Sequence, residues 1–161
     1  MEREKNTTEL LKSIEELRDR ERIRELLATY CSRLDEYDIS GVAACFSEDA
    51  EADYGPGRGG AVKGRKNIAA RIASGQKLFR RTHHQTGQIL IDLRGKEANT
   101  VSYQITWHEL QNGSKELVCL RYIDKLAITD GDWLIIHRRV EVSVVDGFEG
   151  TQWNWVQRQL P

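Results

Sequence analysis

Two adjacent histidines, His83 and His84, are the residues of this sequence best suited to proton transfer. They stand in the stretch RRTHHQTGQ, directly before the apolar run Ile89–Ile91. Successive side chains of a β-strand point to opposite faces, so His83 should share the core face with Ile89 and Ile91, while His84 should face outward. We therefore predict that His83 is a general base and that His84 is its outward-facing neighbour.

One acidic residue, Asp35, stands at a position from which its carboxylate could support a histidine base. In TYCSRLD, Tyr30 continues an apolar stripe at helical spacing and Asp35 lies one step past its end. A carboxylate beside a histidine fixes the ring tautomer and stabilises the imidazolium that forms when the ring takes a proton. The sequence therefore predicts that Asp35 pairs with His83.

Other chemistries find less support in the sequence. The adjacent histidines should point to opposite faces, and no HxxxH or HExxH motif occurs, so we predict no metal site. Cys31, Cys45 and Cys119 form no CxxC pair and are expected to be reduced. The loop GPGRGG lacks phosphate-binding spacing, and Pro56 removes one N–H donor, so a hairpin connection is the preferred interpretation.

Length and charge limit the kinds of partner. The chain has 161 residues, with 24 Lys plus Arg against 25 Asp plus Glu. This balance argues against nucleic acid and membrane surfaces as partners and favours a small molecule. No apolar run approaches the roughly 20 residues of a membrane span, and the first residues lack a signal-peptide core. We expect one cytoplasmic domain over residues 1–161.

The spacing of apolar residues changes once along the chain, from helical repeats to strand-like alternation. Apolar residues recur at helical spacing up to about Leu34, and the gap between Leu17 and Ile23 predicts a bend near Asp19 between two helices. Further helices are expected over 39–46 and 68–79, with a strand over 51–54. Strands separated by turn signals follow over 83–93, 100–111, 117–129 and 133–145.

This order predicts an α+β fold in which a curved, cone-like antiparallel sheet packs against N-terminal helices, as a cystatin-like α+β barrel. The tail over 146–161 contains Trp153 and Trp155, which are too apolar for a free end. We expect these tryptophans to cap a pocket or to be buried in a neighbouring subunit.

The segments IRELLATYCSRLDEYD, HHQTGQILID and DGDWLIIHRRV together resemble the SnoaL-like branch of the nuclear-transport-factor-2-like superfamily, from about residue 20 to residue 145. Within this branch the sequence is similar to cofactor-free lyases of the scytalone dehydratase, hexachlorocyclohexane dehydrochlorinase and bile-acid 7α-dehydratase types. The resemblance implies a His–Asp dyad at His83 and Asp35, no cofactor, and a homotrimer or homodimer.

The resemblance also implies further site residues. Tyr30 is a candidate catalytic hydrogen-bond donor, and Tyr54 and Arg138 are candidate substrate-binding residues. Arg138 could equally pair with an acidic residue such as Asp124 or Glu141. Thr106 and Trp107 complete the candidate substrate-binding set, although packing is the more usual role for such a tryptophan.

Three departures from the family pattern concern the pocket. Gly87 stands where the family usually has asparagine, Val118-Cys119 replaces a frequent Gly-Gly, and Thr106 stands where the bile-acid enzyme has an acidic residue. The expected function is elimination of water or a similar small group from a hydroxylated aromatic or polycyclic compound. Formaldehyde-releasing C–C cleavage of a lignin-derived aromatic, proton-shuttling isomerisation, and a non-catalytic binding or dioxygenase β-subunit-like module stay open as alternatives.

Overall fold

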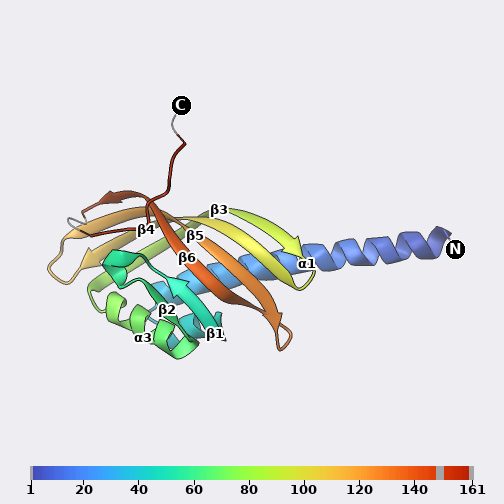
Figure 1. The fold of residues 1–161 in the computed structure, drawn as a ribbon, viewed down its shortest axis with the longest axis horizontal. Helices are drawn as coiled ribbons and strands as arrows, with labels where there is room; N and C mark the ends of the chain where they lie inside the picture. The colour runs from blue at the N-terminus through green and yellow to red at the C-terminus, as the bar shows by residue number, and fades with distance from the viewer. Residues whose placement is uncertain (1, 148–150, 160–161) are drawn as a thin grey trace.

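The computed structural model describes residues 2–147 and 151–159, which fold into helices on one side of a curved sheet (Figure 1). The helices are α1 (Glu2–Asp35), α2 (Ile39–Ala44) and α3 (Arg65–Gln76), with a 3₁₀ turn, η1 (Pro56–Arg58). The strands are β1 (Phe46–Asp53), β2 (Ala61–Lys63), β3 (Phe79–Arg94), β4 (Glu97–Leu110), β5 (Lys115–Thr129) and β6 (Asp132–Asp146). The predicted α+β class is confirmed.

The sheet is curved and unclosed, with the strand order β2-β1-β6-β5-β4-β3. Strands β3 to β6 form an antiparallel meander, as the turn signals predict. Strand β1 differs from the expected pattern because it pairs in parallel with β6. The chain therefore enters the sheet at β1, crosses through α3 to the opposite edge, and returns strand by strand.

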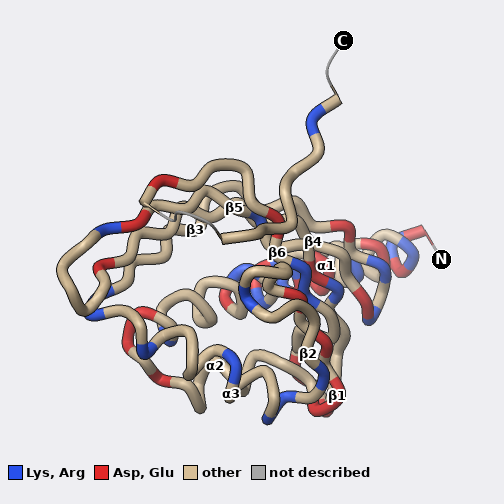
Figure 2. The backbone as a smooth tube through the Cα atoms, turned by 60° about the vertical axis from the view of Figure 1, so that its left-hand side comes forward, with Lys and Arg blue, Asp and Glu red and all other residues tan. Residues whose placement is uncertain are grey.

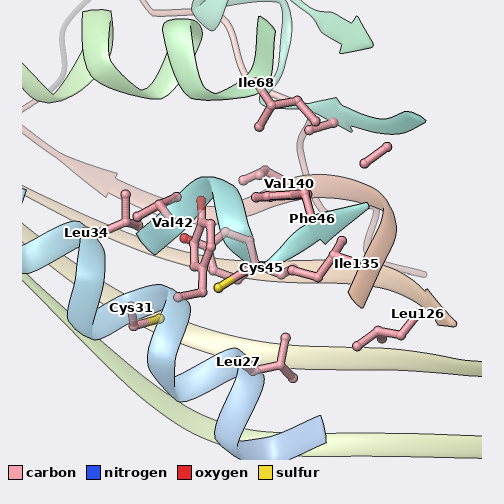
Figure 3. Close-up of a cluster of buried hydrophobic side chains, with 14 of the residues drawn as sticks. Leu27, Cys31, Leu34, Val42, Cys45, Phe46, Ile68, Leu126, Ile135 and Val140 are labelled. Carbon is pink, nitrogen blue, oxygen red and sulfur yellow. The ribbon is translucent and has the colours of Figure 1, made fainter. Parts of the chain in front are cut away.

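The core lies between α1 and the concave side of the sheet (Figure 3). Ile23, Leu27, Tyr30 and Leu34 repeat every three or four residues along α1, so they share one helix face and are all buried. Residues of β1 and β6, including Phe46, pack against them. The second half of α1 is thereby fixed against the sheet.

The predicted bend near Asp19 is wrong, because α1 is one continuous helix. Asp19 accepts a hydrogen bond of 3.1 Å from the Trp133 indole, and Arg20 donates one of 2.9 Å to the carbonyl of Ile91. Beyond this anchor the helix extends past the edge of the sheet (Figures 1 and 2). The break in apolar spacing marks where α1 leaves the domain, and the helix itself does not turn. No helix within residues 2–147 and 151–159 is long and apolar enough to cross a membrane.

Candidate active site

A cavity of about 440 Å³ lies between the concave face of the sheet and the helices. Its wall is built from α1, α3, the four strands β3 to β6 and the loop around η1. Apolar side chains dominate this wall, and a few tyrosines, histidines and arginines interrupt them. Small-molecule sites are typically of this size and composition.

A β-bulge in β3 decides which histidine enters the cavity. The register of β3 with β4 shifts between Thr86 and Ile89, so the strand contains an irregularity there. Even-numbered side chains from Thr82 to Thr86 face inward, and odd-numbered ones do so from Ile89 onward. His84 therefore lines the cavity with a side chain only 5% exposed, whereas the side chain of His83 is 69% exposed.

The prediction that the His83 side chain faces inward is therefore wrong. Counting back from Ile89 and Ile91 assumes unbroken alternation, and one irregular position reverses the phase of every residue before it. His83 Nδ1 lies 3.9 Å from Asp35, beyond hydrogen-bonding distance, and its ring is turned to solvent. The expectation that His84 faces outward is wrong for the same reason.

Asp35 pairs with His84. The His84 Nδ1 atom lies 2.6 Å from Asp35 Oδ1, and the His84 backbone N–H donates to Asp35 Oδ2 at 2.9 Å. The Thr82 hydroxyl donates to Oδ1 at 2.8 Å. When Nδ1–H points at the carboxylate, Nε2 of His84 carries the lone pair that a general base needs. Sequence reasoning therefore identified the acid but missed both Thr82 and the correct histidine.

Asp35 is held in its charged form. Partial burial by itself would raise the pKa of this carboxyl, but the hydrogen bonds from the His84 ring, the His84 backbone and Thr82 outweigh burial. Together they lower the pKa of Asp35 to about 2. A carboxylate at neutral pH stabilises a protonated His84, which is the state that follows proton abstraction.

Tyr30 and Tyr54 both line the cavity, in agreement with their predicted placement. Tyr30 is held by edge-on ring contacts with Phe46 and Tyr122. Burial raises the pKa of both Tyr30 and Tyr54, so both phenols stay protonated and can donate a hydrogen bond. The buried hydroxyl of Tyr54 interacts with that of Tyr30 but meets no described residue at full hydrogen-bond geometry, so the two phenols form one donor group facing the cavity.

Arg138 is not among the residues that line the cavity, which differs from the placement that the resemblance implies. It is fully buried and donates two hydrogen bonds of 2.7 Å to Asp124, the pairing that sequence reasoning left open. Its guanidinium lies 4.1 Å from the ring centre of Tyr30 and 4.0 Å from that of Tyr122. Arg138 therefore supports the tyrosines from behind through cation–π contacts.

Thr106 and Trp107 fall on opposite faces of β4. Thr106 lines the cavity and is 1% exposed, donating a hydrogen bond of 3.3 Å to the carbonyl of Val118. Trp107 pairs in register with His83 on the outer face, so its predicted substrate contact is not formed. Gly87 is exposed within the irregular part of β3, so the family departure at this position also lies away from the cavity.

His108 is a further cavity residue, which the sequence analysis did not single out. Its ring stacks on Phe79 with centroids 4.1 Å apart and lies 5.6 Å from the His84 ring centroid. Its Nδ1 is 3.8 Å from the buried carboxyl of Glu116. The signal was available, because His108 follows Thr106 by two residues and so shares its strand face.

Burial controls the charge at this second histidine. It lowers the pKa of His108 to about 3, and the nearby His84 and Arg58 act in the same direction. Burial raises the pKa of Glu116 to about 7, against the opposing effect of Arg58. His108 is therefore neutral at neutral pH, and Glu116 is partly protonated.

The tail closes one side of the cavity, as predicted for Trp153. The Gly57 N–H donates to the carbonyl of Gln152 at 2.7 Å, and Asn154 donates to Asp53 at 3.0 Å. A Cβ at Gly57 would collide with the Gln152 backbone, so this close approach requires glycine. Trp153 then packs under the Arg58 guanidinium, 5.2 Å from its ring centre, while Trp155 is 48% exposed.

Within the described part of the chain, no group of three or more His, Cys, Asp or Glu side chains is placed to hold a metal ion. The polar groups of the cavity wall are suited to proton transfer and to hydrogen bonding with a substrate.

Comparison with known proteins agrees with this architecture. The family model of the SnoaL-like domain matches residues 15–139. No curated protein matches the chain. A scytalone dehydratase-like protein from Novosphingobium aromaticivorans is similar with a TM-score of 0.84 at 24% identity, covering 90% of this chain and 97% of that one.

Two further structures share the fold. A type 2 hexachlorocyclohexane dehydrochlorinase has a TM-score of 0.77 at 16% identity, covering 88% of this chain and 96% of that one. A protein of unknown function with a cystatin-like fold, from Nostoc punctiforme, has a TM-score of 0.64 at 23% identity, covering 78% and 91%. At these identities the structural likeness establishes the fold.

Proposed function

The chain belongs to the SnoaL-like domain family, and from that premise we propose that it is a cofactor-independent lyase acting on a hydroxylated aromatic or polycyclic small molecule. The observation that carries the proposal is His84, which lies on the wall of a mostly apolar cavity and whose Nδ1 pairs with Asp35. The scytalone dehydratase-like and dehydrochlorinase neighbours support an elimination reaction.

His84 is the proposed base. Its Nε2 takes a proton from a substrate carbon, and Asp35 stabilises the imidazolium formed. The carboxylate is itself fixed by three hydrogen bonds, so the ring needs little reorganisation during the reaction.

The tyrosines are the proposed oxyanion donors. As the C–H bond breaks, negative charge builds on an adjacent carbonyl or phenolic oxygen of the substrate. The hydroxyls of Tyr30 and Tyr54 donate to this oxygen, and Arg138 behind Tyr30 strengthens that donor with its positive charge.

The departing group needs a proton, and a second histidine on the cavity wall is placed to pass one to it. His108 lies on the wall 5.6 Å from His84, with Glu116 behind it as a partly protonated acid. Hydroxide leaving with the C–O bonding electrons accepts a proton from this pair and departs as water, while the C–H electrons form the new C=C bond. Solvent then returns the His84 proton to Glu116. The His108–Glu116 distance of 3.8 Å is long for a hydrogen bond, and catalytic contacts of this kind often shorten when substrate binds.

A substrate screen read by mass spectrometry tests the proposal. Hydroxylated aromatics, steroids and lignin-derived diols are incubated with the wild type, His84→Ala and His83→Ala. We expect loss of 18 mass units, abolished by His84→Ala and unchanged by His83→Ala, which is the matched control on the outer face.

Other outcomes of the screen would contradict parts of the proposal. Loss of 30 mass units would identify formaldehyde release, and an isomer of unchanged mass would identify proton shuttling; either would overturn the dehydratase assignment. Turnover that depends on His83 and not on His84 would overturn the base itself. Binding of these compounds without turnover would favour a binding module.

A further inference from the structure

The projecting half of α1 carries apolar side chains that its own domain does not cover. The exposed fractions are 61% for Leu10, 57% for Leu11, 50% for Ile14 and 66% for Leu17. We call these four residues the α1 stripe. Scattered exposed leucines are ordinary, but a contiguous stripe on a projecting helix is typical of an interaction surface.

The domain to which α1 belongs cannot close over this stripe. An α-helix turns by about 100° per residue, so Ile14 and Ile23 are about 180° apart around the axis. Ile23 belongs to the helix face that packs on the sheet. The α1 stripe therefore faces away from the sheet, and a partner helix can lie along it without meeting the domain.

The spacing of the stripe is that of a coiled-coil seam. Leu10, Ile14 and Leu17 are separated by four and then three residues, as heptad d, a and d positions. Thr7 and Glu21 extend the same line, and Arg3 lies at its N-terminal end. We propose that a second copy of this chain covers the stripe, with the two α1 helices paired antiparallel.

Charge favours this partner and this direction. An antiparallel seam that places Ile14 opposite Leu10 of the second copy also places Arg3 opposite Glu21, twice by symmetry. Leu11, on the flank of the seam, then meets Leu11 of the second copy near the two-fold axis. A parallel pair would instead set Arg3 against Arg3 and Glu21 against Glu21, and like charges disfavour that arrangement.

The shape of the molecule is compatible with this pairing. The body of each copy begins near Asp19, where α1 meets Trp133. With the two-fold axis near residue 12, the two bodies lie at opposite ends of the helix pair. The interface is self-complementary and closed, which is the usual geometry of a soluble homodimer.

Sedimentation of stripe variants tests the pairing. The wild type should sediment as a dimer at micromolar concentration, and Ile14→Glu should raise the dimer Kd by about tenfold or more because it introduces a carboxylate into each half of the seam. Lys12→Glu is the matched control, since it adds a carboxylate on the opposite side of the helix. Circular dichroism and thermal unfolding verify that both variants fold. A monomeric wild type, or an Ile14→Glu protein of unchanged mass, would overturn the proposal.

A charge exchange tests the antiparallel direction. Arg3→Glu alone should weaken the dimer, because two glutamates then face each other at each end of the seam. Adding Glu21→Arg to this variant should restore the Kd toward the wild-type value. Failure of the double variant to recover would overturn the antiparallel register, and none of these measurements depends on a substrate or on the lyase proposal.

Discussion

The His84–Asp35 and His108–Glu116 pairs each combine a histidine on the wall of one cavity with a carboxyl group, yet the two carboxyls are held in different protonation states. Asp35 accepts three hydrogen bonds, and its pKa is lowered to about 2. Glu116 is buried 3.8 Å from His108, and its pKa is raised to about 7. The side chain of Asp35 is 24% exposed and that of Glu116 is 8% exposed, so the carboxyl with more donors also keeps more contact with water.

This difference shows that the type of a residue does not by itself decide whether it acts as an acid or as a base. Donated hydrogen bonds stabilise a carboxylate, whereas burial without them stabilises the neutral acid. When environments push the pKa values of paired groups apart, each group is suited to one direction of proton transfer. The two neighbouring histidines of the cavity wall are therefore matched to accepting a proton at His84 and supplying one at His108.

The largest effect should come from the charged pair. Asp35→Asn removes the charge that stabilises protonated His84 and also permits the wrong ring tautomer. We expect kcat to fall by about 10²–10⁴-fold, measured on a substrate found by the screen. Glu36→Gln, at the neighbouring exposed position, is the control and should retain activity. Full turnover by Asp35→Asn would remove the functional distinction between the two pairs.

A smaller loss should follow at the second pair. His108→Gln keeps a polar side chain on the cavity wall but cannot pass a proton to the leaving group, so kcat should fall by about tenfold, or about 1.4 kcal/mol in activation free energy. The effect should shrink for a substrate whose leaving group needs no proton, such as a halide. Equal losses for both kinds of substrate would indicate a structural role for His108.

The smallest effect is on the pH dependence of folding stability. The contribution of Glu116 should fall as pH rises, whereas that of Asp35 should fall as pH drops. The ordinary pKa of a glutamate, 4.5, applies to Glu116 in the unfolded chain, and folding raises it to about 7. Between these values the unfolded chain loses a proton that the folded chain keeps, so the contribution of Glu116 to stability should decline as pH rises from about 4.5 to about 7. Glu116→Gln should abolish that decline in urea unfolding measured at several pH values.

Asp35 provides the contrast. Its pKa of about 2 in the folded protein lies below the ordinary aspartate value of 3.8, so its stabilising contribution is fully present above that ordinary value. The contribution is lost as pH falls through the folded-state pKa. An identical pH dependence for Asp35→Asn and Glu116→Gln would contradict the different environments assigned to the two groups.

Much of the fold follows from local patterns. The switch from helical spacing to alternation locates the meander, and Gly-containing turns separate its strands. The parallel pairing of β1 with β6 is not visible locally, because it joins segments far apart in the chain. The gap in apolar spacing along α1 resembles a bend in the sequence, although it only changes which face of a continuous helix is apolar.

The sequence predicts most residues of the candidate site, but it does not predict which histidine pairs with Asp35. The predictions for Asp35, Tyr30, Tyr54 and Thr106 place these residues at the cavity or its dyad, because each lies at a regular position of a helix or strand or at a position matched by the resemblance. Arg138 and Trp107, predicted to bind substrate, are not among the cavity-lining residues: Arg138 is buried against Asp124 beneath Tyr30, and Trp107 lies on the outer face of β4.

The sequence by itself determined the class of fold, and it identified Asp35 as an acid that lies beside two adjacent histidines. Only the tertiary structure decided between His83 and His84, because a bulge in β3 appears when the strand is paired with β4. The charge states of Asp35 and Glu116 were likewise decided there, since burial and hydrogen-bond donors are brought to each carboxyl by other segments of the chain.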